Sequence, residues 1–212
     1  MQAPIQKTVP PMRTKQISSD WIALIFIAVL GAIQVYFYDI TFHGPDQIRD
    51  VEIARKLIHR NEWPLNGPPL FGERLSLPPG FYYLLALPLL VRDTEAAIFI
   101  TFGALFALSV WYLWRTVQAQ WGSRYALAYA VLAFPIFAST YTHSAWNPAL
   151  VMTLSNVALG LFISLAHQLR HDALMLTVVV FLLVQIHPSA APLSLGLGTY
   201  ALLNYQTLQN RK

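Results

Sequence analysis

Long stretches without any charged side chain are the feature that most restricts how this chain can fold. A transmembrane helix needs about 20 consecutive apolar residues, so each of the two longest stretches has room for two helices. Breaks are expected within them near HSAWNP (143–148) and HPSAAP (187–192). The pattern predicts an all-α polytopic membrane protein with about six or seven transmembrane segments. The charge-free stretches are 21–38, 75–91, 96–114, 125–169 and 173–210.

The composition agrees with this prediction. Of the 212 residues, 56% are hydrophobic and 11% are charged, whereas soluble domains carry about 25% charged residues. The net charge of +4 is spread thinly along the chain, which gives no support to nucleic-acid binding. Because the chain has no cysteine, disulfides, thiolate metal sites and cysteine nucleophiles are excluded.

The N-terminal region indicates the orientation in the membrane. Residues 1–20 are polar and basic, and they predict a cytoplasmic tail by the positive-inside trend. The following apolar span is too long for the core of a cleaved signal peptide, so it is expected to remain as the first transmembrane segment. We therefore expect a multi-pass protein of the plasma (inner) membrane, with its membrane domain over 21–212.

One polar loop, residues 41–79, carries ten of the 24 charged side chains. Within it, apolar residues recur at helical spacing over 46–61, and charged residues cover most of the remaining surface. This spacing predicts an amphipathic juxtamembrane helix lying in the plane of the interface. Asp46 is a candidate N-cap, and Trp63-Pro64 is expected to end the helix. Five prolines and three glycines predict a loop over 64–80.

Two topologies are compatible with the charge pattern. If every apolar segment crosses, the loop 115–124 with its two arginines lies on the same side as the loop 41–79, against the positive-inside trend. If 77–91 is instead re-entrant, the loop 115–124 becomes cytoplasmic, and the two polar breaks share the outer face with Asp46. We favour the gathering of the polar breaks on one face, whereas the geometry of 77–91 stays open.

The acidic residues of the polar loop are the first candidates for chemistry. Asp46 and Asp50 lie four residues apart and therefore share a helix face. A carboxylate there is able to serve as general base toward an acceptor hydroxyl, and two carboxylates are able to share a divalent cation through their oxygens. The alternative is structural: Asp46 caps the helix, and Asp50 pairs with neighbouring basic side chains.

Basic and aromatic residues of the same region are candidates for substrate binding. Arg49 and Arg74 are suited to gripping a phosphate, although contact with lipid headgroups is the alternative. Tyr82 and Tyr83 are placed either to stack on a sugar or to belong to the aromatic belt of the membrane interface.

Two polar breaks lie inside apolar stretches. His143, Trp146 and Asn147 form the first, where the alternative to a substrate contact is an interfacial anchor followed by a helix start at Asn147-Pro148. His187 forms the second. An ionisable residue within a membrane is a functional candidate by default, but a neutral histidine bonded to a backbone carbonyl is an equal alternative.

Several motifs in order resemble one family of enzymes. DQIRDVEIARKLI (46–58), PLNGPPLFG (64–72) and LPPGFYYLLALPLL (77–90) follow the first apolar span, with WNPAL (146–150) and QIHPSAAPL (185–193) downstream. Their order and spacing resemble the membrane glycosyltransferases of the C superfamily. The likeness is to the bacterial dolichyl-phosphate-mannose-type branch, relatives of protein O-mannosyltransferases and lipid A aminoarabinose transferases.

The resemblance implies transfer of a sugar from a polyprenyl-phosphate-linked donor to an acceptor hydroxyl at the outer face, with inversion. By position, Asp46 matches the loop aspartate that serves as general base in this branch. Asp50, Arg49 and His187 match less closely. Arg74, Tyr82, Tyr83 and Asn147 are the remaining candidates for substrate contacts. A non-catalytic membrane module that binds polyprenyl phosphate or a partner subunit is the alternative function.

Members of the resembled family are roughly twice this length and contain more spans. We therefore expect this chain to correspond to the N-terminal half of such an enzyme. A partner subunit supplying the missing spans is expected in that case, in addition to the lipid-linked donor and the surrounding membrane lipids. No cofactor is required by these motifs beyond the divalent cation considered for the two aspartates.

Overall fold

The computed structural model describes residues 44–70, 75–137, 146–166 and 170–203, with isolated positions between 21 and 36. These residues are mostly helical, as the sequence predicts. A short antiparallel pair, β1 (Pro69–Leu70) and β2 (Leu75–Ser76), interrupts the helices within the polar loop. A 3-10 turn covers Pro188–Ala190. The helices are α2 (Pro45–Arg60), α3 (Gly80–Val91), α4 (Glu95–Trp121), α5 (Ser123–Phe137), α6 (Asn147–Ala166), α7 (Arg170–Ile186) and α8 (Ala191–Leu203).

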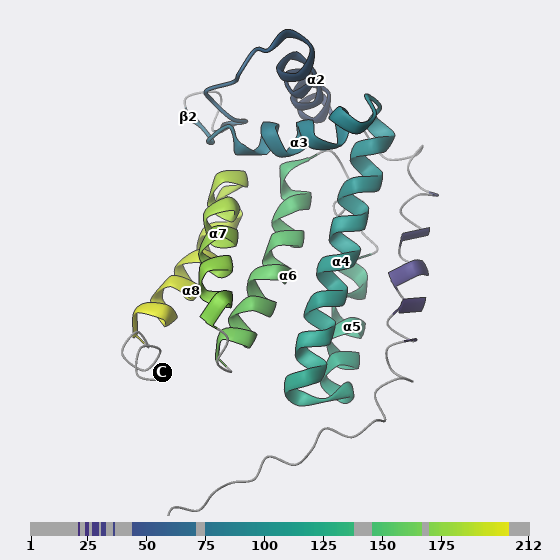
Figure 1. The fold of residues 1–212 in the computed structure, drawn as a ribbon, viewed down its shortest axis with the longest axis vertical. Helices are drawn as coiled ribbons and strands as arrows, with labels where there is room; N and C mark the ends of the chain where they lie inside the picture. Colours follow the sequence, from purple (N-terminus) through teal and green to yellow (C-terminus); the bar gives the residue numbers. More distant parts are fainter. Residues whose placement is uncertain are drawn as a thin grey trace, which may run out of the picture.

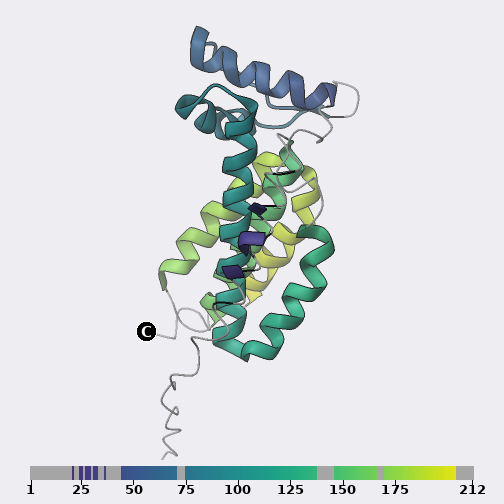
Figure 2. The same cartoon turned by 90° about the vertical axis from the view of Figure 1, so that its right-hand side faces the viewer.

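The helices form a bundle, and α2 and α3 together form a cap across one end of it (Figure 1). Helices α4, α5, α6 and α7 run roughly alongside one another, and α3 lies across the upper ends of α4, α6 and α7 (Figure 1). Helix α2 lies above α3 and also runs across the bundle end (Figure 2). The N-terminus of α6 and the C-terminus of α7 point toward this cap. The cap therefore joins the polar loop to one end of the apolar bundle.

One apolar cluster fixes the cap to the bundle. It joins Val51 and Ala54 of α2 to five side chains of α3 and to the upper ends of three bundle helices. Ala54, Phe81 and Leu85 are fully buried within it. Burying apolar surface of this kind stabilises the packing by roughly 25 cal/mol per Å². The other members are Tyr82, Ala86, Leu89, Ile98, Phe102, Leu150 and Ile186.

The structure bears on the geometry of 77–91, which the sequence left open between a crossing and a re-entrant segment. With 12 residues, α3 is about 18 Å long, whereas the hydrocarbon core is about 30 Å thick. Its apolar residues pack within the protein: Phe81, Leu85 and Leu89 belong to the cluster between the cap and the bundle. Pro88 does not interrupt α3 and lies within its last turn.

Two described helices, Glu95–Trp121 and Asn147–Leu165, are long and apolar enough to cross a membrane. Many of their large apolar side chains point outward, including Leu105, Leu108 and Leu159. A lipid environment would accommodate these side chains without exposing them to water. The total number of spans remains a prediction.

The loop expected at 115–124 is much shorter in the structure. Helix α4 continues to Trp121, and Gly122 alone turns the chain, with φ at 92°. Glycine adopts this positive φ without strain. The extra turns of α4 are retained because Leu113, Trp114 and Val117 pack against Ala126 and Ala130 of α5. The prediction of a loop over 115–124 was wrong. It relied on the polar residues of RTVQAQW (115–121), which outnumber the apolar residues that hold this segment against α5.

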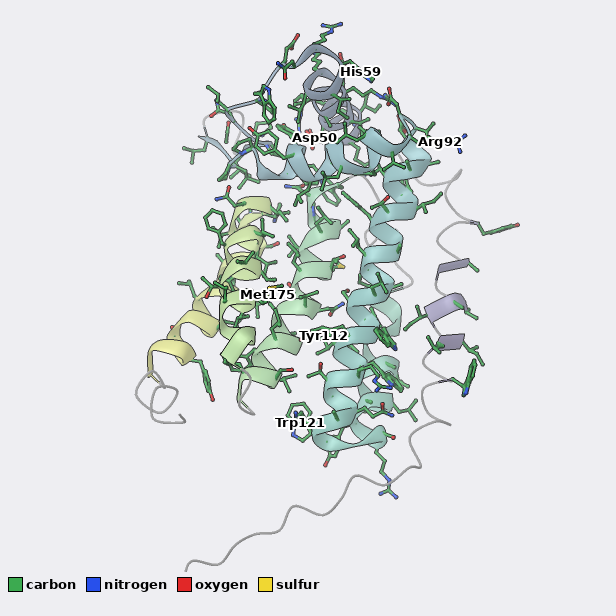
Figure 3. All side chains as sticks on the ribbon, in the orientation of Figure 1. Asp50, His59, Arg92, Tyr112, Trp121 and Met175 are labelled. Carbon is green, nitrogen blue, oxygen red and sulfur yellow. The ribbon has the colours of Figure 1, made fainter. Side chains whose placement is uncertain are left out.

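The polar breaks gather at the cap end, as favoured from the sequence. Helix α6 begins at Asn147, and its side-chain amide Nδ2 donates to the carbonyl oxygen of Ile186 at the end of α7 (3.0 Å). Gly80 of α3 lies next to the side chain of Gln185, because a Cβ built there would come within 3.4 Å of it. Trp121 lies at the opposite end of α4 (Figure 3).

The orientation of α3 leads to a test of topology. Because the chain has no cysteine, single-cysteine variants Glu62→Cys and Ser123→Cys report the side of each position through a membrane-impermeant maleimide. With α3 lying across the bundle end, only α4 separates the two positions, so we expect labelling from opposite sides. Labelling of both from the same side would mean that α3 also crosses.

Candidate functional site

Helix α2 brings the acidic and basic candidates together. Gly44 is its N-cap residue, and the backbone N–H of Gly44 donates to Oε1 of Gln47 (3.0 Å). Asp46 therefore lies in the first helical turn. The expectation that Asp46 is the N-cap was wrong. A carboxylate in the first turn is still favoured by the helix dipole. The first turn leaves the Asp46 side chain 67% exposed.

Arg49 links the two aspartates. Its Nη1 donates to Oδ1 of Asp46 (2.8 Å), while its Nε and Nη2 both donate to Oδ1 of Asp50 (2.9 and 2.8 Å). The structural alternative considered for Asp50, a pairing with a basic neighbour, is thus confirmed. One guanidinium bonds both carboxylates. This arrangement fixes the Arg49 side chain, and it does not present the two carboxylates together to a divalent cation.

Asp50 is a buried charged residue at the α2–α3 contact (Figure 3). Its side chain is 1% exposed, and the hydroxyl of Tyr82 donates to its Oδ1 (3.3 Å). Burial raises the pKa of Asp50, an effect that Arg49 opposes. Burial and the adjacent carboxylate raise the pKa of Tyr82 to about 12, so Tyr82 stays protonated and able to donate.

A polar pocket of about 410 Å³ opens beside this network. One wall is α2, which contributes Arg49, Ile53 and Lys56 from a single face. The Nζ of Lys56 lies 3.3 Å from Oε1 of Glu52. Tyr82 also lines the pocket, and the loop that follows α2 supplies the rest of the lining: Glu62, Trp63, Pro64, Asn66, Gly67 and Pro69. Pockets of this size are typical of small-molecule sites.

Gly67 allows the loop wall to close. Its backbone N–H donates to the carbonyl oxygen of Leu77 (2.6 Å), just outside the β1–β2 pair. A Cβ at this position would overlap the carbonyl oxygens of Leu77 and Pro78. Only glycine therefore fits where the two sides of the loop meet and shape the pocket wall.

An apolar groove of about 690 Å³ lies on the other side of α3. Leu84, Leu87 and Pro88 of α3 border it, and α4, α6 and α7 supply the remaining walls. Leu87, Leu105 and Leu108 at its margin are exposed on the outer surface of the bundle. Helix α3 thus has a polar pocket at its α2 side and an apolar groove at its bundle side.

The remaining candidates are bonded to other parts of the protein, and Tyr83 supports the pocket wall from behind. Tyr83 donates through its hydroxyl to the carbonyl oxygen of Pro64 (2.7 Å). Asn147, 5% exposed, bonds Ile186 as described above. His187 caps the 3-10 turn, because its Nδ1 accepts from the backbone N–H of Ser189 (3.1 Å). His187 therefore lies at a helix break, and its ring bonds Ser189 in place of the backbone carbonyl considered from the sequence.

Tyr82 corrects one interpretation from the sequence. A surface position for its ring, whether stacked on a sugar or in the aromatic belt, is wrong for this residue, because Tyr82 is only 2% exposed. The hydrogen bond to Asp50 spans 32 residues of sequence, so no local pattern indicated it. Arg74 and His143 lie outside the described residues. Within the described part of the chain, no group of three or more histidine, aspartate or glutamate side chains is arranged to hold a metal ion.

Sequence reasoning missed a second ionic cluster on the cap. Asp93, in the turn between α3 and α4, accepts from Nε of Arg55 and contacts Nε2 of His59, both at 2.8 Å. The bonds to Arg55 and His59 lower the pKa of Asp93. This cluster ties the C-terminal half of α2 to the start of the bundle, and so holds the pocket wall in place.

Comparison with known proteins returned no match: no family model, no curated protein and no solved structure is similar to this chain.

Proposed function

We propose that this chain binds a polyprenyl-phosphate-linked sugar and transfers the sugar to an acceptor hydroxyl at a membrane surface. The observation that carries the proposal is the pairing of two cavities across one short helix. The polar pocket on the α2 side has Arg49 and Lys56 in its wall, and the groove on the bundle side is apolar. A lipid-linked phosphate has the same two parts, an anionic head and an apolar tail.

The two cavities suit the parts of such a donor in different ways. The apolar walls of the groove suit an isoprenoid chain, whose burial is favoured in proportion to its area. Arginine and lysine form charge-assisted bonds with phosphate oxygens. The guanidinium of Arg49 is fixed by Asp46 and Asp50, so binding a phosphate costs little side-chain ordering. A six- or seven-span architecture with α2 at the membrane interface completes the proposal.

The proposed reaction is the one that the resemblance of the sequence motifs implies. The acceptor oxygen forms a bond to the anomeric carbon as the bond from that carbon to the phosphate oxygen breaks, which inverts the configuration. Asp46 takes the proton from the acceptor hydroxyl. Polyprenyl phosphate leaves with the electron pair, and Arg49 and Lys56 stabilise its negative charge. General-base assistance of this kind contributes about 10²–10⁴-fold in rate.

A second candidate function is a non-catalytic module that binds polyprenyl phosphate or pairs with a partner subunit. One observation favours it: Asp46 does not line the pocket, and its carboxylate is bonded to Arg49. The two candidates share lipid binding and differ in turnover. Asp46→Asn separates them, because only the transferase depends on that carboxylate.

Lipid binding tests the feature common to both candidates. We expect a long-chain polyprenyl phosphate to bind the purified protein in nanodiscs saturably, and Lys56→Met to weaken this binding about tenfold, since one charge-assisted bond contributes about 1.5–3 kcal/mol. Arg124→Met, on an exposed arginine beyond the turn at Gly122, serves as the control and is expected to have no effect. Equal weakening by both variants would indicate non-specific attraction of the anionic lipid.

A further inference from the structure

Trp63 is an exposed aromatic residue held firmly in the pocket wall. Its side chain is 63% exposed, yet its indole Nε1 donates to Oδ1 of Asn61 (2.7 Å). Its ring also contacts Tyr83, with ring centroids 5.8 Å apart. Tyr83 is itself anchored through its hydroxyl to Pro64. The indole is therefore fixed from two sides while much of its surface faces outward.

The position of Asn61 makes this anchoring possible. Asn61 ends α2 in the left-handed region, with φ at 55° and ψ at 32°, and asparagine is one of the few residues other than glycine that tolerate it. This conformation turns the chain so that residue 63 returns toward the Asn61 side chain. The helix end and the placement of the indole are thus parts of one local structure.

The hydrogen bond also distinguishes Trp63 from an interfacial anchor. A tryptophan in the aromatic belt uses its N–H to bond water or headgroups at the apolar boundary. In Trp63 this N–H is already bonded within the protein. What remains available is the ring surface, which is apolar and carries the negative face of the π system.

The groups around Trp63 suit hydroxyl-bearing ligands. Glu62 and Asn66 lie in the same wall. Among the residues that the structure describes, the nearest cation to Glu62 is Nη1 of Arg60 at 3.9 Å, and the Asn66 amide has no hydrogen-bond partner. Carboxylate and amide oxygens accept from hydroxyl groups, and the amide N–H₂ also donates. Arg49 and Lys56 of α2 line the same pocket.

We propose that Trp63, Glu62 and Asn66 form a saccharide-binding subsite, in which the C–H face of a pyranose ring packs on the indole. The sugar hydroxyls bond Glu62 and Asn66, and the phosphate that carries the sugar lies toward Arg49 and Lys56. This inference deepens the proposed function, since it orients the donor in the pocket. Binding of a free glycoside does not require transfer, so the two can be tested separately.

Saturation-transfer NMR on the protein in nanodiscs tests the subsite. The probes are the methyl glycosides of mannose, glucose, galactose and N-acetylglucosamine. We expect at least one to bind saturably, Trp63→Leu to weaken that binding at least tenfold, and Trp63→Phe to retain most of it because the aromatic face remains. Trp121→Leu is the control, since Trp121 is exposed at the opposite end of the molecule.

The outcomes separate the subsite from the transferase. Absence of saturable binding by all four glycosides, or equal binding by the wild type and Trp63→Leu, would overturn the subsite. Sugar transfer that survives Trp63→Leu with an unchanged donor KM would also overturn it, while leaving the transferase standing. Glycoside binding that depends on Trp63, in a protein that transfers no sugar, would support the subsite and overturn the proposed transferase.

Discussion

Asp46→Asn is expected to reduce sugar transfer by about 10²–10⁴-fold, the usual contribution of a positioned general base. Asparagine has nearly the same shape, and its oxygen still accepts from Nη1 of Arg49, which lies 2.8 Å from the present carboxylate. It does not take a proton from an acceptor hydroxyl. The loss is therefore expected in kcat, and binding of polyprenyl phosphate should remain close to that of the wild type.

The exposure of Asp46 makes this variant informative. A side chain 67% exposed contributes little to stability through its ion pair, so the thermal unfolding midpoint should not move. Glu52→Gln is a matched control, because Glu52 is a similarly exposed carboxylate on α2 whose partner is Lys56. Turnover retained by Asp46→Asn would remove Asp46 as the base, and lost turnover in both variants would point to a general effect of charge on α2.

Because Arg49 is 36% exposed and keeps its bond to Asp46, Asp50→Ala is expected to destabilise the protein by about 1–3 kcal/mol, the usual cost of leaving a buried polar group without its partner. It leaves Nε and Nη2 of Arg49 and the hydroxyl of Tyr82 without their common acceptor. The contact between α2 and α3 would open, and the α2 wall of the pocket would lose its position. A lower midpoint temperature of thermal unfolding, followed by intrinsic tryptophan fluorescence, would measure this change.

Asp50→Asn separates the two consequences of burial. The amide keeps the size of the side chain and an oxygen acceptor for Arg49 and Tyr82, and it removes the charge whose burial raises the pKa of Asp50. We therefore expect Asp50→Asn to cost much less stability than Asp50→Ala. Equal destabilisation by both would mean that the charge itself holds α2 against α3.

The pKa of Asp50 also fixes the sign of a pH effect. Because burial raises it in the folded protein, the folded state binds the proton more tightly than the unfolded chain does. The contribution of Asp50 to stability is then greatest below its unfolded pKa, near 3.9, and declines as the pH rises through its folded pKa. In Asp50→Asn this decline should be absent.

The local patterns of the sequence predicted the helices well and their orientations poorly. Apolar and charged residues at helical spacing identified α2, whose described bounds differ by one residue at each end from the predicted 46–61. The breaks at Asn147 and His187 were also predicted, because proline follows each of them. These features depend on neighbours in the chain, which the sequence displays directly.

What could not be predicted depends on contacts between distant segments. Gly80–Val91 is apolar on all sides. From sequence alone, such a helix is equally consistent with a membrane span and with a cap packed on other helices. The burial of Asp50 depends on Tyr82, and the fixed indole of Trp63 depends on Tyr83 and on the left-handed Asn61. Neither the burial of Asp50 nor the position of the Trp63 indole can be predicted without knowing how α2 crosses α3.

The most direct test of the proposed function is transfer itself, measured in nanodiscs cut from the protein's own membrane so that any partner subunit is retained. The donor is a polyprenyl phosphate bearing a radiolabelled sugar, and the release of free polyprenyl phosphate is followed together with labelled product. We predict equal amounts of both from the wild type, with inverted configuration at the anomeric carbon, and almost none from Asp46→Asn. Saturable binding of the donor without release of polyprenyl phosphate would contradict the transferase and leave a lipid-binding module.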